Sequence, residues 1–375
     1  MKIGLGATFL HNALKRGHYD GISIYTESLL KQLNGLNIDS ECVVFGEKDK
    51  YTIDHECNGQ VNIRSSYQYL AAISVLSGKS FCDAENAMTG VDVFHATDHH
   101  IPKFKRTPVV STIMDAIPFS HPEWVSKRLR KFKNYAFRKA ANWSDHIITI
   151  SEYSKSDIIN YFGIPEEKIS VIYLGFDTVL QKKYSQEITK QVKEKYNIHN
   201  NYFLFVGTIQ PRKNLDRIID AYNRLPKAIR DDYSLVIIGK YGWGCDSFRK
   251  NASNALKNIK WLTNVSNQEL HPLMQSAAAL VYPSLYEGFG LPVLEGFAAN
   301  IPVISSNTTS IPEVAGDAAL LVNPLDTDDI SDAMRRIVDD GDLSGDLVKK
   351  GKYQLDVFSW ENCAKDTIKV YEKFI

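Results

Sequence analysis

Short apolar runs alternate with amphipathic segments along most of the chain. VDVFHAT (91–97), PVVSTIMD (108–115) and DHIITIS (145–151) have the length and the branched aliphatic content of buried parallel strands. Helical patterns such as IYTESLLKQL (24–33) and RLRKFKNYAFRKAA (128–141) accompany them. Alternation of strand and helix predicts an α/β fold with a parallel sheet and right-handed crossovers.

This alternation is interrupted once, by the polar, lysine-rich residues 178–201. A second series of strand patterns follows at 202–209, 233–240, 279–284, 301–306 and 318–324. We therefore expect two domains that join at about 175–195, which agrees with a length of 375 residues. Two open α/β sheets whose carboxyl edges face each other would form a cleft between the domains. The last helical pattern (360–374) could cap either domain.

Composition excludes several classes of protein. Lys+Arg and Asp+Glu both number 44, so the formal net charge is zero and we expect no nucleic-acid partner. The five cysteines are scattered and contain no C-x-x-C, which indicates a reducing compartment and argues against a disulfide framework. The opening MKIGLGATFL is too short for a signal peptide and resembles a first strand, and no run approaches the ~18 apolar residues of a membrane span. We expect a cytoplasmic protein.

The stretch PSLYEGFGLPVLEGFAANIPV (283–303) is the candidate for chemistry. Gly288 and Gly290 allow the backbone to turn and to approach a ligand, and Pro292 fits the first turn of a helix that continues to Ala299. The open N–H groups and the positive end of such a helix favour an anion, above all a phosphate.

Two glutamates flank this expected phosphate site, Glu287 in the loop and Glu295 in the expected first turn. Carboxylates would repel a phosphate, but they accept strong hydrogen bonds from sugar hydroxyls. A phosphate site between two carboxylates that bind hydroxyl groups matches a nucleotide sugar, in which a diphosphate lies between a sugar and a ribose. The alternative is an ordinary Gly/Pro turn before a helix whose dipole the acids stabilise, and physical chemistry alone leaves both open.

YEGFGLPVLEGFA resembles the E-x7-E signature of family 4 glycosyltransferases, retaining enzymes of the GT-B fold. Further similarity covers nearly the whole chain, at 21–33, 148–177, 205–222, 264–292, 308–324 and 358–364. It implies two Rossmann-like domains that face each other across a deep cleft: an acceptor domain (1–177), a donor domain (178–357), and a final helix (358–375) that could cross back to the first. GTIQPRKNL is most similar to bacterial O-antigen-type mannosyltransferases.

The resemblance implies roles for individual residues. Glu287 would contact the donor sugar and stabilise positive charge at its anomeric carbon, and Glu295 would bind the ribose. Lys213 would pair with the phosphates. The loop Gly288, Phe289, Gly290 and Leu291 would offer backbone N–H groups to the diphosphate, Gly21 would belong to a first-domain loop closing over it, and Val265 and residues 240–243 would lie near the base.

Two positions depart from the family pattern. Thr208 follows Gly207 where many relatives have an arginine that contacts phosphate, and Arg212 could supply this charge instead. Met114 stands where relatives often have a histidine. The neighbouring Asp115 could orient the acceptor hydroxyl or line the cleft, or simply cap the turn after its strand.

We expect no metal and no cofactor other than the nucleotide sugar itself. FHATDHH (94–100) clusters metal-ligand types but fits the lining of a cleft, and the D-x-D patterns at 326–328 and 340–342 fit a helix-flanking surface. Phe9 interrupts a G-x-G-x-x-G fingerprint that begins at Gly4, which argues against a nicotinamide cofactor.

One segment is strongly basic. The segment from Lys103 to Lys139 contains ten basic and two acidic residues. Many of the basic residues lie at 127–139, where aromatic residues are interleaved with them. Such a helix could bind the anionic inner face of the cytoplasmic membrane as a peripheral contact. The alternative is a solvated helix face whose aromatic side chains pack inward.

These expectations combine into one predicted function. The enzyme would transfer a hexose with retention, with mannose from GDP-mannose as the leading candidate, onto a lipid-linked or polysaccharide glycan. Alternatives are a UDP-hexose donor, a nucleotide-sugar epimerase, or a non-catalytic relative that binds sugar nucleotides. Same-face attack and double displacement through Glu287 both remain open.

Overall fold

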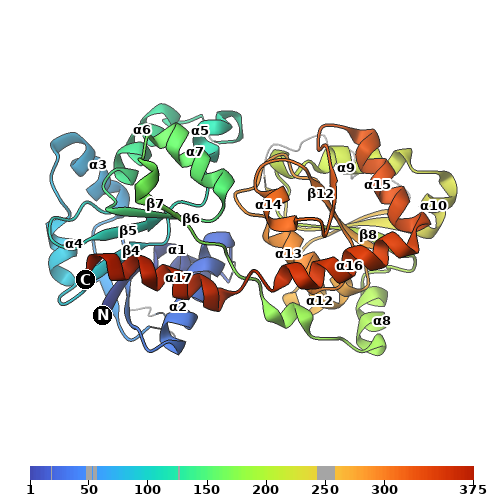
Figure 1. The fold of residues 1–375 in the computed structure, drawn as a ribbon, viewed down its shortest axis with the longest axis horizontal. Coiled ribbons are helices and arrows are strands. Elements are labelled where there is room, and N and C mark those ends of the chain that lie inside the picture. The colour runs from blue at the N-terminus through green and yellow to red at the C-terminus, as the bar shows by residue number, and fades with distance from the viewer. Residues whose placement is uncertain (18, 48–52, 54–56, 126, 243–257) are drawn as a thin grey trace. The chain divides into compact units, whose positions relative to one another are not determined.

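The computed structural model describes residues 1–17, 19–47, 53, 57–125, 127–242 and 258–375. Two compact units divide the chain (Figure 1). The first unit comprises Met1–Gly175 together with Ser359–Ile375, and the second unit comprises Phe176–Phe358. Each unit contains a parallel sheet with helices, so the predicted α/β fold class is confirmed.

The first unit is built on a seven-stranded parallel sheet with the order β3-β2-β1-β4-β5-β6-β7. This is the strand order of a dinucleotide-binding fold extended by one strand. The predicted strands at 91–97, 108–115 and 145–151 are confirmed as β4, β5 and β6. The bounds are β1 Lys2–Gly6, β2 Asp39–Phe45, β3 Gln60–Ile63, β4 Val93–Ala96, β5 Val109–Thr112, β6 His146–Thr149 and β7 Ile169–Val171.

The helices of the first unit include both helices that the sequence predicted there, at 24–33 (in α2) and 128–141 (in α6). Asp20 caps α2, because its side chain accepts a hydrogen bond from Ser23 N at 2.8 Å. The bounds are α1 Thr8–Arg16, α2 Gly21–Gly35, α3 Tyr67–Ser77, α4 Cys82–Ala87, α5 Ile117–Ser120, η1 Pro122–Trp124, α6 Arg130–Ala141, α7 Glu152–Phe162 and η2 Glu166–Lys168.

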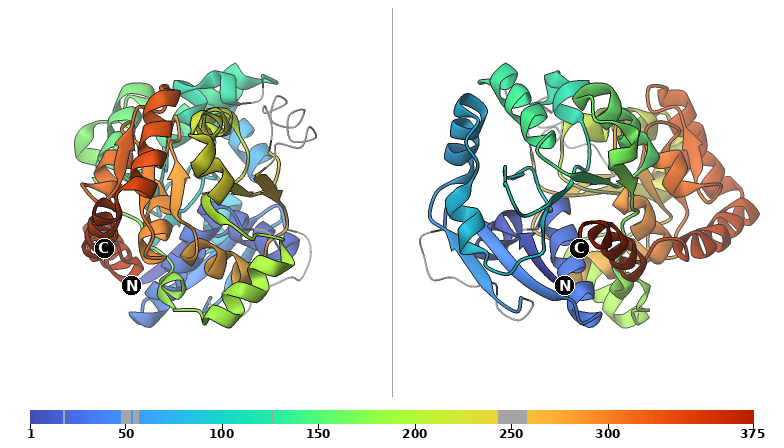
Figure 2. Two further views of the ribbon diagram at one scale, coloured as in Figure 1. Left: turned by 90° about the vertical axis from the view of Figure 1, so that its right-hand side faces the viewer. Right: turned by 60° about the vertical axis from the view of Figure 1, so that its left-hand side comes forward.

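The C-terminal helix α17 (Trp360–Tyr371), with η5 (Glu372–Phe374), packs against α2 in the first unit (Figure 2). Its Tyr371 hydroxyl lies 2.6 Å from His95 Nδ1, and His95 Nε2 lies 2.8 Å from Thr112 Oγ1. Burial lowers the pKa of His95 to about 3, so the ring is neutral at physiological pH. This fully buried hydrogen-bonded network fixes the end of the chain to β4 and β5.

The second unit is built on a six-stranded parallel sheet with the order β10-β9-β8-β11-β12-β13. All five strand patterns predicted between 202 and 324 are confirmed, as β8, β9, β11, β12 and β13. The bounds are β8 Asn201–Val206, β9 Tyr233–Ile238, β10 Ile259–Leu262, β11 Ala279–Tyr282, β12 Val303–Ser306 and β13 Leu320–Val322.

The helices of the second unit begin inside the polar stretch 178–201, which carries η3 and α8. α13 packs very close to the sheet, since a Cβ on Gly296 would lie 2.6 Å from Val303 Cγ2. The bounds are η3 Thr178–Gln181, α8 Gln186–Lys195, η4 Pro211–Lys213, α9 Leu215–Arg224, α10 Lys227–Asp232, α12 Asn267–Gln275, α13 Leu291–Ala298, α14 Ile311–Ala315, α15 Thr327–Asp339 and α16 Gly341–Leu355.

The expectation against disulfides is wrong for one pair, because Cys42 and Cys57 are joined, with their Cα atoms 6.0 Å apart. Cys42 lies in β2 and pairs with Gln60 of β3, so the chain just before β3 runs beside it. Cys82 and Cys363 are free, and Cys245 lies outside the described residues. Within the described parts of the chain, no helix combines the length and apolar character that crossing a bilayer requires.

Candidate active site

Glu287 is the centre of a buried charge cluster in the second unit, which we call the Glu287 cluster (Arg212, Lys213, Tyr282 and Glu287). Lys213 Nζ donates to Glu287 Oε1 at 2.6 Å, and Arg212 Nη1 donates to Glu287 Oε2 at 2.8 Å. The Tyr282 hydroxyl donates to Oε1 at 3.0 Å and accepts a hydrogen bond from Lys213 Nζ. Both oxygens of the carboxylate are therefore occupied by donors from η4 and β11.

Burial and charge pairing set the protonation states in this cluster. Glu287 is 6% exposed and Lys213 is 7% exposed. Burial alone would raise the pKa of Glu287, but Arg212 and Lys213 hold it at about 2. Burial lowers the pKa of Lys213 to about 8, against the opposing effect of Glu287. Near pH 7 the site thus holds an ionised carboxylate and a charged lysine whose proton is easily lost.

The loop that carries Glu287 is braced by the segment before α14. Ser310 Oγ lies 2.9 Å from both the Glu287 and the Phe289 carbonyl oxygens, and Glu287 N donates to Thr309 Oγ1 at 3.2 Å. Gly290 has φ of 113°, and a Cβ there would lie 2.6 Å from Ile311 Cδ1. Only glycine fits this position without strain, as the sequence predicted for a close turn.

A helix begins immediately after this loop. α13 begins at Leu291, so Glu295 is the fifth residue of the helix. The sequence had indicated that Glu295 lies in the first turn, and this prediction is wrong. No hydrogen bond within the described residues uses the backbone N–H of Gly290 or Leu291. Ser306 Oγ and Thr308 Oγ1 are likewise buried without a partner there. Unpaired donors beside the positive end of a helix favour an anionic ligand.

Glu295 lies in a different electrostatic environment from Glu287. Burial and, to a smaller extent, the carboxylate of Asp177 raise its pKa to about 7, against the lowering effect of Lys213. Asp177 caps η3, the short helix that packs against α13. The two glutamates of the signature therefore differ in charge state near neutral pH: Glu287 is ionised, whereas Glu295 is about half protonated.

Three further candidates of the second unit lie at strand ends. Gly207 follows β8 with φ of 147°, and its N–H donates to Ile238 O at 3.0 Å. Thr208 is exposed and its side chain carries no charge. The guanidinium that contacts Glu287 beside Lys213 belongs to Arg212. Val265 is partly exposed just before α12, and Trp243 of the predicted base pocket lies outside the described residues.

Asp115 and Gly21 belong to the first unit. Asp115 Oδ1 accepts a hydrogen bond from Ile117 N at 3.0 Å, so this side chain does cap the turn after β5. Gly21 is the first residue of α2, and a Cβ on it would meet no atom within 4 Å. Packing in this structure thus does not require glycine at position 21.

Tyr282 is the member of the cluster that the sequence did not reveal. It ends β11 and is fully buried, which is typical of a core aromatic residue. Its ring also lies 4.7 Å from Lys213 Nζ, so it packs on the lysine while its hydroxyl contacts Glu287. A tyrosine at the carboxyl end of an otherwise aliphatic strand was the available signal.

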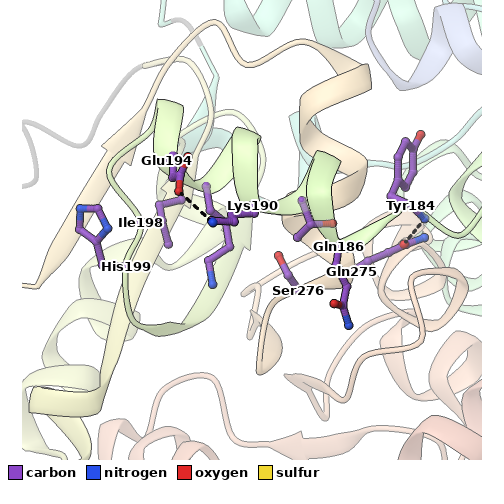
Figure 3. A pocket seen from close by; sticks show the side chains of 10 residues that line it. Tyr184, Gln186, Lys190, Glu194, Ile198, His199, Gln275 and Ser276 are labelled. Atoms are coloured by element: carbon purple, nitrogen blue, oxygen red, sulfur yellow. Dashed lines mark hydrogen bonds and ion pairs between the residues drawn. The ribbon is translucent and has the colours of Figure 1, made fainter.

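A cavity of about 500 Å³ lies elsewhere in the second unit, beside α8 and α12 (Figure 3). It is lined by polar side chains, among them Gln186, Lys190, Lys193 and Gln275. Lys190 pairs with Glu194 across 3.9 Å, and Gln275 Oε1 accepts from Tyr184 N at 3.4 Å. None of the predicted site residues lines it, so it is separate from the Glu287 cluster.

The potential metal ligands that the structure describes form no recognisable metal site. Among the described residues, no group of three or more His, Cys, Asp or Glu side chains is arranged to hold a metal ion. In the D-x-D patterns, Asp326 caps α15 and Asp340 caps α16. His95 belongs to the buried network with Tyr371, and His99 and His100 follow β4.

Comparison with known proteins identifies the family. Residues 19–180 match the family model described as Glycosyltransferase Family 4, and residues 186–354 match Glycosyl transferases group 1. The chain is 32% identical over 283 residues to the O-antigen chain mannosyltransferase B of Escherichia coli, which covers 75% of this chain and 74% of the relative. It is 32% identical over 243 residues to the O-antigen chain mannosyltransferase RfbU of Salmonella typhimurium, covering 64% and 63% respectively.

The fold agrees with solved structures. The crystal structure of Anabaena HepE in complex with UDP and glucose has a TM-score of 0.75 at 17% identity, with both chains covered completely. This similarity concerns the fold alone. Together with the relatives, it shows that the chain belongs to the family 4 glycosyltransferases with the GT-B fold.

Proposed function

We propose that this enzyme transfers mannose from GDP-mannose, with retention, to a lipid-linked or polysaccharide glycan. The observation that carries the proposal is the Glu287 cluster beside the open N-terminus of α13. A buried carboxylate held by Lys213 and Arg212 is suited to lie beside a sugar, while the neighbouring N–H groups of Gly290 and Leu291 are suited to its diphosphate.

The proposal gives each charge a role in leaving-group departure. When the bond from the anomeric carbon to phosphate breaks, negative charge builds on the departing diphosphate. Lys213 and the α13 N-terminus stabilise that charge, and Glu287 stabilises the positive charge that develops on the sugar. Arg212, which pairs with Glu287 Oε2 beside Lys213, is the residue that we propose supplies the charge that Thr208 lacks.

The mannosyl donor is supported by the two relatives above, both named as O-antigen chain mannosyltransferases. A UDP-hexose remains the competing donor, since HepE of the same fold was crystallised with UDP and glucose. An assay of transfer to a lipid-diphosphate-linked glycan with GDP-mannose and UDP-glucose in parallel tests the choice. With the acceptor present, transfer is expected from GDP-mannose and not from UDP-glucose. Turnover with UDP-glucose alone would overturn the donor, and hydrolysis or epimerisation without acceptor would overturn the reaction.

The raised pKa of Glu295 predicts that donor binding depends on pH. Ribose hydroxyls donate hydrogen bonds to an ionised carboxylate, so binding favours the deprotonated form. Since the pKa is about 7, affinity for GDP-mannose is expected to be full above pH 8 and to fall about tenfold per pH unit well below pH 7. Calorimetry with GDP-mannose, whose diphosphate diester does not titrate in this range, measures the effect.

Two variants control this measurement. Glu295→Gln should weaken binding and remove the pH dependence. Asp177→Asn should shift the midpoint to lower pH, because the Asp177 charge raises the Glu295 pKa. A pH profile that is the same in wild type and Glu295→Gln would contradict the ribose role.

We also propose that α6 and the residues before it contact an anionic membrane. Leu129, Phe132 and Tyr135 are 65%, 44% and 52% exposed, and Lys127, Arg128, Lys131 and Lys139 are exposed around them. Phe137, in contrast, packs inward on Phe162 with ring centroids 5.0 Å apart. Exposed apolar side chains surrounded by basic ones fit the interface of an anionic bilayer, where a lipid-linked acceptor would be found.

Replacing Lys127, Arg128, Lys131 and Lys139 with glutamine is expected to weaken vesicle binding by about 10²- to 10³-fold, because each basic residue near such a surface contributes about 1 kcal/mol. Co-sedimentation with phosphatidylglycerol vesicles measures this. The matched control replaces Lys182, Lys183, Lys190 and Lys227, four exposed lysines of the second unit. Equal binding by the two quadruple variants would exclude this surface.

A further inference from the structure

The Tyr282 hydroxyl lies between two opposite charges of the Glu287 cluster. It accepts a hydrogen bond from Lys213 Nζ and donates one to Glu287 Oε1 at 3.0 Å. The same Oε1 also accepts directly from Nζ at 2.6 Å. The ammonium, the hydroxyl and the carboxylate oxygen therefore form a closed triangle of hydrogen bonds, in which each group contacts the other two.

Packing holds Tyr282 in one orientation. The residue is fully buried, and its ring stacks on Phe205 of β8 with centroids 5.9 Å apart and an interplanar angle of 25°. Its backbone pairs with Ser305 of β12, and its carbonyl oxygen accepts a hydrogen bond from Ser305 Oγ at 2.9 Å. A lysine side chain is long and flexible, so its rigid partners decide where the ammonium points. Tyr282 is such a partner for Lys213.

Lys213 has one N–H group more than the cluster uses. An ammonium carries three donors. One is held by the Tyr282 hydroxyl and one by Glu287 Oε1, and no third hydrogen bond of Nζ exists within the described residues. Because the nitrogen is tetrahedral, fixing two N–H groups also fixes the direction of the third. That third donor is available to a phosphate oxygen of the nucleotide sugar.

A role in core packing alone would not require the hydroxyl. Phenylalanine would keep the stack on Phe205 and the contact with Lys213, whose Nζ lies 4.7 Å from the ring centroid. A buried hydroxyl is costly unless it is hydrogen-bonded, and both hydrogen bonds of Tyr282 go to charged groups. The hydroxyl therefore serves the charges of the cluster.

We propose that Tyr282 is a positioning residue for glycosyl transfer, whose hydroxyl aligns the Lys213 ammonium so that one N–H group is left for the departing diphosphate. When a phosphate draws Lys213 away from Glu287, the Tyr282 hydroxyl still donates to Oε1 and keeps the carboxylate in place. The inference rests on the proposed functions of Lys213 and Glu287, and it names the residue that holds both.

The ionisable groups around Lys213 set the direction of the expected pH effect. Burial, opposed by Glu287 and Glu295 and aided by Arg212, lowers its pKa to about 8. Burial raises the pKa of Tyr282 well above its usual value, so its hydroxyl keeps its proton. A hydrogen-bond acceptor on an ammonium favours the charged form, so loss of the hydroxyl lowers the pKa of Lys213 further. In Tyr282→Phe the lysine therefore loses its proton at lower pH.

Tyr282→Phe and Tyr222→Phe form the matched pair for the test. Tyr222 is also a buried tyrosine of the second unit, but its hydroxyl donates to a backbone carbonyl, Tyr233 O, at 2.8 Å. The alkaline fall of kcat/KM should begin about one pH unit lower in Tyr282→Phe than in the wild type, the worth of about one hydrogen bond to a charged group. Tyr222→Phe should keep the wild-type profile. An unchanged profile in Tyr282→Phe, or an equal shift in both variants, would overturn the proposal.

Titration of Lys213 itself makes the test independent of the reaction. In protein without donor, NMR of isotope-labelled lysine side chains follows this ionisation, and the Lys213 resonance is the one missing from Lys213→Met. Its midpoint should lie about one pH unit lower in Tyr282→Phe and at the wild-type value in Tyr222→Phe. This shift in a protein that transfers no sugar would keep the alignment of Lys213 and overturn the proposed function. A wild-type midpoint in Tyr282→Phe would overturn the inference.

Discussion

Glu287→Gln is expected to lower kcat for mannosyl transfer by about 10³-fold, at the upper end of what one electrostatic contact contributes. The amide retains the shape and an acceptor oxygen for Lys213 and Tyr282, but it removes the charge that faces the sugar. A second effect adds to the first. Glu287 raises the pKa of Lys213, which is about 8 in the wild type, so loss of the carboxylate leaves that lysine largely neutral at pH 7.

Glu295→Gln is the matched control, because it makes the same chemical change on the same loop and helix. It is expected to raise the donor KM with little change in kcat, whereas Glu287→Gln should act on kcat. Thermal unfolding of both variants is needed, since removing one partner of a buried ion pair costs about 3–5 kcal/mol of stability. A folded Glu287→Gln protein with wild-type kcat would contradict the role of this carboxylate.

Lys213→Met is expected to lower kcat by about 10²-fold, because it removes the ammonium that stabilises the departing diphosphate. Methionine keeps an apolar stem over the Tyr282 ring. Glu287 would still be held by Arg212 Nη1 at 2.8 Å and by the Tyr282 hydroxyl at 3.0 Å. The loss is therefore attributable to the lysine charge and not to collapse of the cluster.

The pH–rate profile tests the same charge without a mutation. Since the pKa of Lys213 in the free enzyme is about 8, wild-type kcat/KM is expected to fall above pH 8 as this proton is lost, because kcat/KM reports the ionisations of the free enzyme. Lys213→Arg should move this fall to higher pH, and Lys213→Met should lack it. Lys190→Met, at a side chain that is 71% exposed, is the control and should match the wild type. An alkaline fall that persists in Lys213→Met would assign it to another group.

The sequence predicted the α/β fold because its central strands are rich in apolar residues, and the sheet buries every residue of β4, β5 and β11. The outer strands carried weaker signals. β3 (QVNI) is half polar and largely unburied, β7 has three residues, and β10 (IKWL) alternates without full burial. The Cys42–Cys57 disulfide followed from the pairing of β2 with β3, and spacing along the chain does not show which strands are neighbours.

For the candidate site, local chemistry was readable and tertiary contacts were not. The glycines, Pro292 and the two glutamates predicted a loop that is followed by a helix. α13 begins at Leu291, earlier than the sequence indicated, and Glu295 therefore lies beyond the first turn. The different pKa values of Glu287 and Glu295 depend on Arg212, Lys213 and Asp177, which lie far away in sequence. Tyr282 is near Glu287 in sequence, but it ends a buried strand, and the sequence does not show that its hydroxyl turns to Glu287.

A crystal structure of the enzyme with GDP-mannose tests the central claim most directly. We predict the diphosphate on the backbone N–H groups of Gly290 and Leu291 with Lys213 Nζ at a phosphate oxygen. Glu287 should then contact mannose hydroxyls, and Glu295 should contact the ribose. A nucleotide bound anywhere else, or bound here with both glutamates turned away from it, would contradict the account.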